Sequence, residues 1–174
     1  MARHLVLDCD GRARTDGEAL APVDGEHAAG RLARNPGFLA ARFTSVAATV
    51  SNRALAPFGL RTRSYSLVEL AAASGGLSQR EVGRILALDK AHVVRLVDQV
   101  VEMGLVVRER DPRDGRAWLI RATPKGDAVA RKAGQALDDA YSLLLGPLST
   151  DEISAAMTAL QKLAFAIEVP DHEV

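Results

Sequence analysis

Hydrophobic residues recur at helical spacing along most of the chain after residue 35. Asn35-Pro36 is typical of a helix start, because an N-cap residue precedes a proline at the first helical position. Apolar side chains then return every three or four residues. The pattern predicts a long helix to about Leu55, followed by a second helix over about 65–73 that Gly75-Gly76 ends.

From Leu77 the pattern changes to two short helices joined by a tight turn. Ser78 and Glu81 form a capping box, in which each side chain can accept a hydrogen bond from an otherwise unpaired backbone N–H. Apolar residues follow at helical spacing as far as Leu88, and Asp89 then caps another helix. That helix has one apolar and one polar face. We therefore expect a helix-turn-helix.

A hairpin follows this pair of helices. Gly104 stands where a left-handed helix end is favoured, and residues 105–110 are rich in β-branched side chains. Residues 111–116 contain Pro and Asp-Gly, which are turn residues, and 117–122 returns as a second strand. The two strands form a wing beside the helix-turn-helix.

The C-terminal part is again helical. Thr123-Pro124 repeats the cap-plus-proline start of a long helix to about Leu145, and Ser149 with Glu152 is a second capping box. The last helix carries a regular apolar stripe that needs a partner surface. The predicted fold class is mainly α with a small β-wing, a winged helix-turn-helix flanked by dimerisation helices from both chain ends.

Four segments follow from these patterns. Residues 1–34 lack sustained periodicity, and we expect a largely mobile extension there. We expect residues 35–76 to form helices for dimerisation and packing between lobes, 77–123 to form the winged helix-turn-helix module, and 124–169 to form C-terminal dimerisation helices.

Length and composition limit the number of domains and the cellular location of the protein. The chain has 174 residues, enough for one domain with a buried core. No apolar run is long enough to span a bilayer, and the apolar stretch near Met1 is too short for a secretion signal, so we expect no membrane contact and a cytoplasmic location. The single cysteine, Cys9, excludes an internal disulfide and a cysteine-based zinc site.

The charges are unevenly distributed although the formal net charge is zero. Residues 61–126 hold 12 basic and 8 acidic side chains, whereas 127–174 hold 3 basic and 8 acidic ones. The segment 61–126, which contains the winged module, therefore carries +4, and residues 127–174 carry −5. A positive surface on one lobe favours a polyanionic partner, either DNA or an acidic protein.

The order of elements and several local motifs resemble the MarR family (multiple antibiotic resistance regulators) over about residues 35–167. The motifs are Leu77-Ser78-Gln79-Arg80-Glu81-Val82, Asp89-Lys90 with Arg95-Leu96-Val97-Asp98, Gly104-Leu105-Val106, Asp111-Pro112-Arg113-Asp114-Gly115-Arg116-Ala117, and Thr123-Pro124-Lys125-Gly126. The resemblance implies a homodimer with interlocked terminal helices that binds double-stranded DNA. It further implies that the second helix of each helix-turn-helix enters a major groove while the wing reaches the adjacent minor groove.

The candidate DNA-binding residues lie on this module. The outward face of the second helix would read bases, and its alternative role is a solvated helix face. Arg116 matches the family's minor-groove arginine, with Asp114 as its brace. Arg110 and Arg113 would contact phosphates, as would Arg80 and Lys90 near the helix starts. Ala91-His92 replaces the commoner Ser-Thr pair of the family, so the sequence preference should differ. The base-reading candidates are Ala91, His92, Arg95 and Gln99.

Other residues offer less specific signals. Phe43, Phe58 and Tyr65 lie on or beside helices that line a pocket for small aromatic or phenolic effectors in relatives, and core packing is their alternative role. Trp118 alternates with Ile120 along the second strand, which favours packing at the base of the wing over stacking on a nucleotide base.

The sequence also bears on three other functions: a redox sensor, a protein-interaction module and an enzyme. A redox sensor built on Cys9 is disfavoured because Asp8 and Asp10 oppose the thiolate. A winged-helix protein-interaction module remains the alternative to DNA binding. The sequence shows no nucleophile-base spacing, phosphate loop or metal-ligand cluster, so we expect no enzyme, no cofactor and no metal site.

Overall fold

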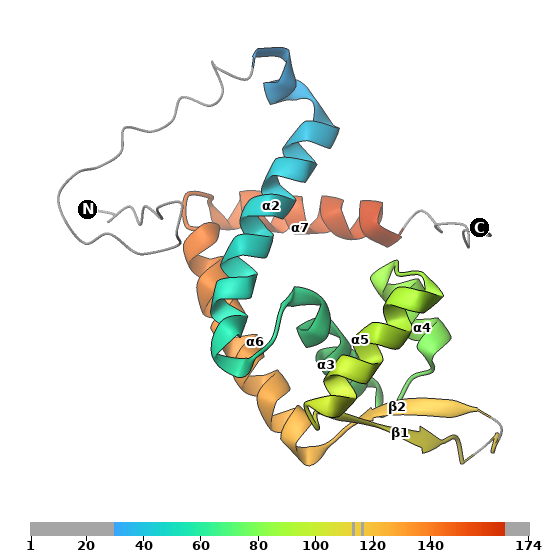
Figure 1. The fold of residues 1–174 in the computed structure, drawn as a ribbon. Helices are drawn as coiled ribbons and strands as arrows, with labels where there is room; N and C mark the ends of the chain where they lie inside the picture. The colour runs from blue at the N-terminus through green and yellow to red at the C-terminus, as the bar shows by residue number, and fades with distance from the viewer. Residues whose placement is uncertain (1–29, 113, 116, 166–174) are drawn as a thin grey trace. The chain divides into compact units, whose positions relative to one another are not determined.

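The computed structural model describes residues 30–112, 114–115 and 117–165 (Figure 1). They belong to two compact units, Met1–Thr49 and Val50–Val174. The elements are mostly helices with one two-stranded sheet, as the sequence predicts. In chain order they are η1 (Gly30–Arg34), α2 (Pro36–Leu55), η2 (Ala56–Phe58), α3 (Thr62–Ser74), α4 (Gln79–Leu86), α5 (Lys90–Glu102), β1 (Val106–Arg110), β2 (Trp118–Ala122), α6 (Pro124–Leu144) and α7 (Thr150–Phe165).

Local caps define the predicted helix starts. The Asn35 side chain accepts a hydrogen bond from the Phe38 N–H at 2.8 Å. At α4, the Ser78 N–H donates to Glu81 Oε2 at 2.7 Å, and the Glu81 N–H donates to Ser78 Oγ at 3.3 Å. Asp89 caps α5 and Thr123 caps α6 in the same way. Each start therefore depends on residues within one turn of it.

The turn between α4 and α5 uses a left-handed alanine. Ala87 has φ 50°, a conformation that costs a residue with a Cβ more than it costs glycine. The Leu88 N–H donates to the Gly83 carbonyl at 2.9 Å and closes the turn. A Cβ on Gly83 would lie 3.0 Å from the Leu88 carbonyl oxygen, so the tight approach of the two helices requires a very small side chain there.

The wing is joined to the start of the helix-turn-helix. β1 and β2 pair antiparallel, with Val106 opposite Ala122 and Arg110 opposite Trp118. Leu77 forms an isolated bridge with Ile120, with N–H to carbonyl distances of 3.1 and 2.8 Å. The sequence pattern did not predict this third short stretch. This bridge attaches Leu77, which precedes the N-cap residue of α4, to the base of the wing.

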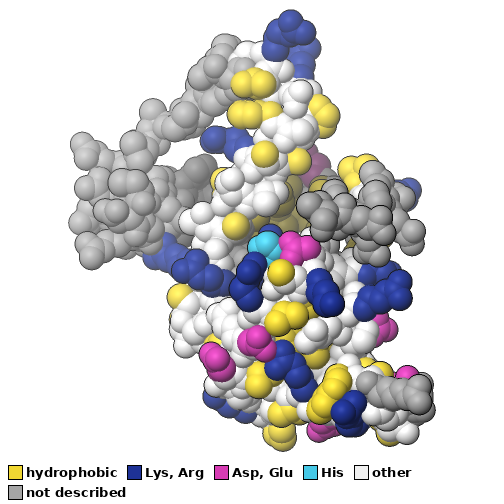
Figure 2. All heavy atoms as spheres, turned by 45° about the vertical axis from the view of Figure 1, so that its right-hand side comes forward, with side chains coloured by type: hydrophobic (Ala, Val, Ile, Leu, Met, Phe, Trp, Pro, Cys, Tyr) yellow, Lys and Arg dark blue, Asp and Glu magenta, His cyan; other side chains and the backbone are white. Residues whose placement is uncertain are grey.

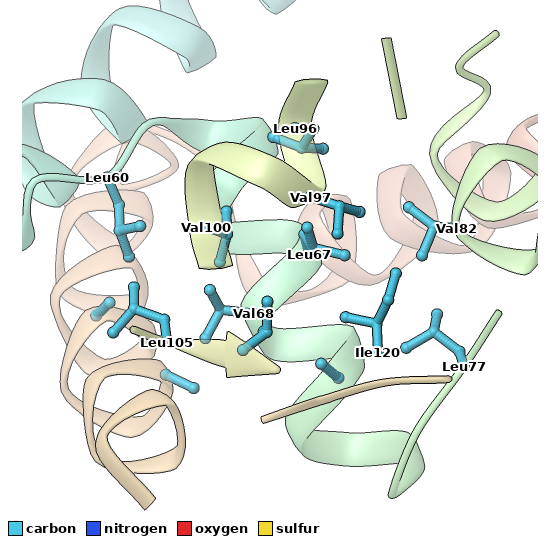
Figure 3. Packing of buried hydrophobic residues seen from close by; sticks show 14 of the residues in the cluster. Leu60, Leu67, Val68, Leu77, Val82, Leu96, Val97, Val100, Leu105 and Ile120 are labelled. Carbon is cyan, nitrogen blue, oxygen red and sulfur yellow. The ribbon is translucent and has the colours of Figure 1, made fainter. Parts of the chain in front are cut away.

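One hydrophobic core holds the winged module and α6 together (Figure 3). Its members come from the end of α2, from α3, α4, α5, both strands and α6, and from the connections between them. A fully buried Leu or Val stabilises a fold by about 1.5–3 kcal/mol. The members are Leu55, Leu60, Leu67, Val68, Ala71, Leu77, Val82, Val93, Leu96, Val97, Val100, Leu105, Val106, Ile120, Ala130, Ala133 and Leu137.

The described residues contain neither a membrane-spanning helix nor a metal-binding cluster. None of their helices has the length and apolar character needed to cross a membrane. Among the same residues, no group of three or more His, Cys, Asp or Glu side chains could hold a metal ion.

Candidate nucleic-acid interface

Helix α5 presents the predicted polar face to solvent. Ala91, His92, Arg95 and Gln99 are all exposed, whereas Val93, Leu96, Val97 and Val100 are buried in the core. Several Lys and Arg side chains, with a few acidic ones among them, lie on the face of the molecule shown in Figure 2. The base-reading candidates therefore lie together on one exposed face of α5.

Asp89 caps the N-terminus of α5, and its carboxylate also contacts the His92 imidazole. Asp89 Oδ1 accepts a hydrogen bond from the His92 N–H at 2.9 Å, and Asp89 Oδ2 contacts His92 Nδ1. The hydrogen bond from the His92 backbone, together with that from its ring, holds the pKa of Asp89 below its usual value. Because Asp89 engages Nδ1, Nε2 is the ring nitrogen of His92 that can meet a further partner.

An ion pair joins α5 to the wing. Arg108 Nη2 on β1 lies 2.5 Å from Asp98 Oδ1 on α5, and the two side chains are 31% and 51% exposed. With Gln79 and Trp118 they line a hollow of about 490 Å³. The sequence analysis did not single out Asp98 or Arg108 as a pair. The only local signal was the alternation of β1, which places Arg108 on the same face as buried Val106.

Trp118 lies in a different environment from the one predicted. Ile120 is 1% exposed in the core, but Trp118, one step along the same face of β2, is 49% exposed. The Arg110 guanidinium lies 4.2 Å from the centre of the Trp118 ring, and the two residues are directly opposite each other in the sheet. The expectation of packing at the wing base is wrong for this residue, because the sheet has already left the core there.

The opposite face of the wing is anchored to the connection between α3 and α4. Arg121 Nη1 donates to the Gly75 carbonyl, and Arg121 Nε lies 3.3 Å from Glu109 Oε2. Gly76 has φ 130°, and a Cβ there would lie 3.0 Å from Arg121 Cγ. Glycine at this position therefore lets the backbone adopt an unusual conformation beside the arginine.

The tip of the wing is only partly described. Asp114 is exposed, while Arg113 and Arg116 lie outside the described residues. The expected contact between Asp114 and Arg116 therefore remains a prediction. Cys9 also lies outside the described residues.

Comparison with known proteins places this architecture in a family. The sequence model of the MarR family matches residues 59–117. A MarR-family transcriptional regulator from Rhodococcus sp. RHA1 is 36% identical, with a TM-score of 0.72 over 78% of this chain and 98% of that one. The chain belongs to the MarR family. CouR from Rhodococcus jostii RHA1, solved bound to p-coumaroyl-CoA, is also 36% identical, with a TM-score of 0.71 over 79% of this chain and 97% of that one.

A curated relative agrees over a shorter region. The transcriptional regulatory protein for the hcr operon of Thauera aromatica is 35% identical over 68 residues, which are 38% of this chain and 41% of that relative. The chain thus matches less than half of that protein's length. Membership of the MarR family makes the chain a DNA-binding transcriptional regulator and confirms the expectation that it is not an enzyme.

The predicted effector residues of this MarR-family chain have different surroundings. Phe58 and Tyr65 are partly buried against the core, whereas Phe43 is 43% exposed on the part of α2 that belongs to the first compact unit. Burial, reinforced by Glu69, raises the pKa of Tyr65 to about 12. The Tyr65 hydroxyl therefore stays protonated and donates to Glu69 Oε2 at 3.2 Å. A joint ligand site for the three residues stays a prediction.

Proposed function

We propose that this regulator acts as a homodimer that binds a pseudo-palindromic operator, represses transcription and leaves the DNA when a small ligand binds. The observation that carries the proposal is the exposed polar face of α5. The Asp98–Arg108 ion pair connects this helix to β1 of the wing. In a winged helix-turn-helix, such a helix enters the major groove and a wing contacts the DNA beside it. Two copies would place their α5 helices on half-sites about 34–36 Å apart.

Each candidate side chain has a distinct role in this proposal. Arg95 and Gln99 would donate to base edges, the His92 ring would contact a base edge through Nε2, and the Ala91 methyl would fit against a thymine methyl. Arg110 and Arg113 would contact phosphates, and Arg116, braced by Asp114, would enter the minor groove. The stacking of Arg110 on Trp118 supports its role, because it orders an otherwise flexible side chain.

The proposed effector is a small molecule with an aromatic or phenolic group. CouR, 36% identical to this chain, was solved with p-coumaroyl-CoA, whose acyl group is a phenol. Phe43, Phe58 and Tyr65 are the residues that we assign to this ligand. Their aromatic rings suit a flat, apolar group, and the protonated Tyr65 hydroxyl suits a polar substituent.

The test begins with selection of bound sequences from a random duplex pool by the full-length protein. Arg95→Ala should weaken binding to the selected operator by about 5- to 150-fold, the range expected when a base-reading contact is lost. Arg131→Ala is the matched control, since it removes an equally exposed arginine from α6. Adding p-coumaroyl-CoA, with coenzyme A alone as its control, tests ligand-induced release in the same assay.

The outcomes separate the parts of the proposal. Failure to select any symmetric element would contradict operator binding by a dimer. Equal losses for Arg95→Ala and Arg131→Ala would show that α5 contributes only charge. Retention of the operator in the presence of p-coumaroyl-CoA would contradict the proposed effector and leave DNA binding intact.

A further inference from the structure

The end of helix α5 and the start of helix α6 meet in an unusually close backbone contact. A Cβ built on Gly126 would lie only 2.0 Å from the Leu105 carbonyl oxygen, which no side chain could tolerate without displacing the backbone. Gly126 is itself buried. Glycine at this position therefore sets how closely α6 can approach the residues that follow α5.

Hydrogen bonds between the same two segments fix this contact. The Thr123 N–H donates to the Leu105 carbonyl at 3.0 Å, and the Thr123 hydroxyl donates to the Gly104 carbonyl at 2.8 Å. The same hydroxyl accepts from the Gly126 N–H at 2.9 Å and so caps α6. One threonine side chain therefore both starts α6 and attaches it to the chain leaving α5.

Lys125 completes the contact from the exposed side. Its Nζ donates to the carbonyl of Met103, the C-cap residue of α5, at 2.8 Å. The last carbonyls of a helix lack intrahelical partners and carry partial negative charge, so an ammonium group is favourable there. We call Leu105, Thr123, Lys125 and Gly126 the α5–α6 joint.

We propose that the α5–α6 joint sets the angle between the recognition helix and α6, and thereby determines which half-site spacing the dimer prefers. The inference rests on the proposed function, because a spacing exists only for a dimer on two half-sites. In this proposal the residues of the joint are positioning residues, which act through the orientation of α5.

Geometry gives the joint a large effect. A helix of 21 residues such as α6 is about 32 Å long, so a rotation of about 6° at one end moves the other end by about 3 Å. That displacement is close to one base-pair step of about 3.4 Å. The far end of α6 is held by the Tyr141 hydroxyl, which hydrogen-bonds to the buried Ser51 hydroxyl at 2.7 Å. A change at the joint would therefore alter the reach of α5.

The experiment uses the full-length protein and a mixture of duplexes that carry its two selected half-sites with different spacer lengths. Wild type, Lys125→Met and Gly126→Ala each select from this mixture, and the bound spacer lengths are counted. Lys132→Met is the control, because it makes the same chemical change at another exposed position of α6. Melting temperatures are measured for every variant.

The expected result is a shift or broadening of the preferred spacing for Lys125→Met, with binding at the wild-type spacing weakened about threefold to tenfold. Gly126→Ala should shift it further if it folds, and Lys125→Met carries the test if it does not. A purely structural role would lower the melting temperature and leave the spacing distribution unchanged, which would overturn the inference. If wild type selects no paired half-sites, the proposed function itself fails, and the inference fails with it.

Discussion

At the scale of single residues, Asp98 and Arg108 form a side-chain ion pair between the recognition helix and the wing. Both side chains are partly exposed, so water screens their attraction and the pair contributes little to stability in itself. Its effect is geometric: the ion pair restricts how far β1 can move away from α5. We therefore expect a small coupling free energy between Asp98 and Arg108, although the pair helps to orient the wing relative to α5.

A double-mutant cycle measures that coupling. Asp98→Asn, Arg108→Gln and the double variant are unfolded in urea at low and high salt. The coupling free energy should be about 0.2–1 kcal/mol at low salt and should decrease in 1 M salt, because exposed charges are screened. Additive effects of the two substitutions at low salt would show that the ion pair contributes nothing to stability.

At the scale of the elements, the capping boxes of α4 and α7 carry a pH dependence. Hydrogen bonds from the Ser78 and Ser149 backbones lower the pKa of Glu81 and of Glu152 from the usual 4.5. A carboxyl whose pKa is lower in the folded state stabilises the fold above the unfolded pKa. This contribution is lost as the pH falls through the folded pKa.

The predicted consequence is a loss of stability below about pH 4.5 that depends on the box glutamate. Glu81→Gln should reduce the free energy of unfolding at pH 7 and flatten its decline toward pH 3, because the variant has no carboxyl to protonate. Urea unfolding across this pH range measures both effects. Glu102→Gln, at the end of α5, is the control and should keep the wild-type slope; an unchanged slope for Glu81→Gln would contradict the assignment.

The same elements show what the sequence can predict. The starts of α4, α5, α6 and α7 were all correctly predicted, because a cap is an interaction among residues within four positions of one another. The Asp98–Arg108 pair joins residues 10 positions apart, and the Arg121 bond to Gly75 joins residues 46 apart. Neither follows from local spacing, since both depend on how the elements pack.

Two further features illustrate the same limit. Ala87 adopts φ 50° although alanine gives no local signal for that conformation, so the turn is imposed by the packing of α4 against α5. Trp118 continues the alternation of β2 but lies beyond the edge of the core, which the alternation alone does not reveal. Periodicity predicts the face of a strand, whereas the extent of the core depends on the neighbouring helices.

At the scale of the whole molecule, α7 is the element whose apolar surface is least explained by one chain. Met157 and Leu160 are 47% and 48% exposed, and Leu163 and Phe165 are 68% and 79% exposed. Such a series on one helix exceeds the scattered apolar residues normal on a monomer's surface. Burying the exposed part of each against a second chain would favour association by roughly 1–2 kcal/mol per residue, a fraction of the value for a fully exposed side chain. A second copy of α7 is the partner that the proposed homodimer supplies.

Leu160→Glu tests this assignment, because a charge in a dimer interface loses its water without gaining a partner. Analytical ultracentrifugation should show a dimer for wild type and a monomer for Leu160→Glu at the same micromolar concentration. Gln161→Glu adds the same charge at the next position and should remain dimeric. A monomeric wild type, or equal dissociation of both variants, would contradict an α7 interface.

Measurements of DNA binding distinguish loss of the α7 dimer interface from damage to the α5 surface. The core of the winged module contains none of the α7 residues, so a monomeric Leu160→Glu protein should keep an intact α5 surface. Its affinity for a duplex with one half-site should equal that of wild type, whereas its affinity for the paired half-sites should fall by about 10²–10⁴, the avidity gained by linking two binding modules. Equal losses of affinity for both duplexes would mean that the substitution had disturbed the α5 surface itself. A contribution of dimerisation to operator binding would then be unsupported.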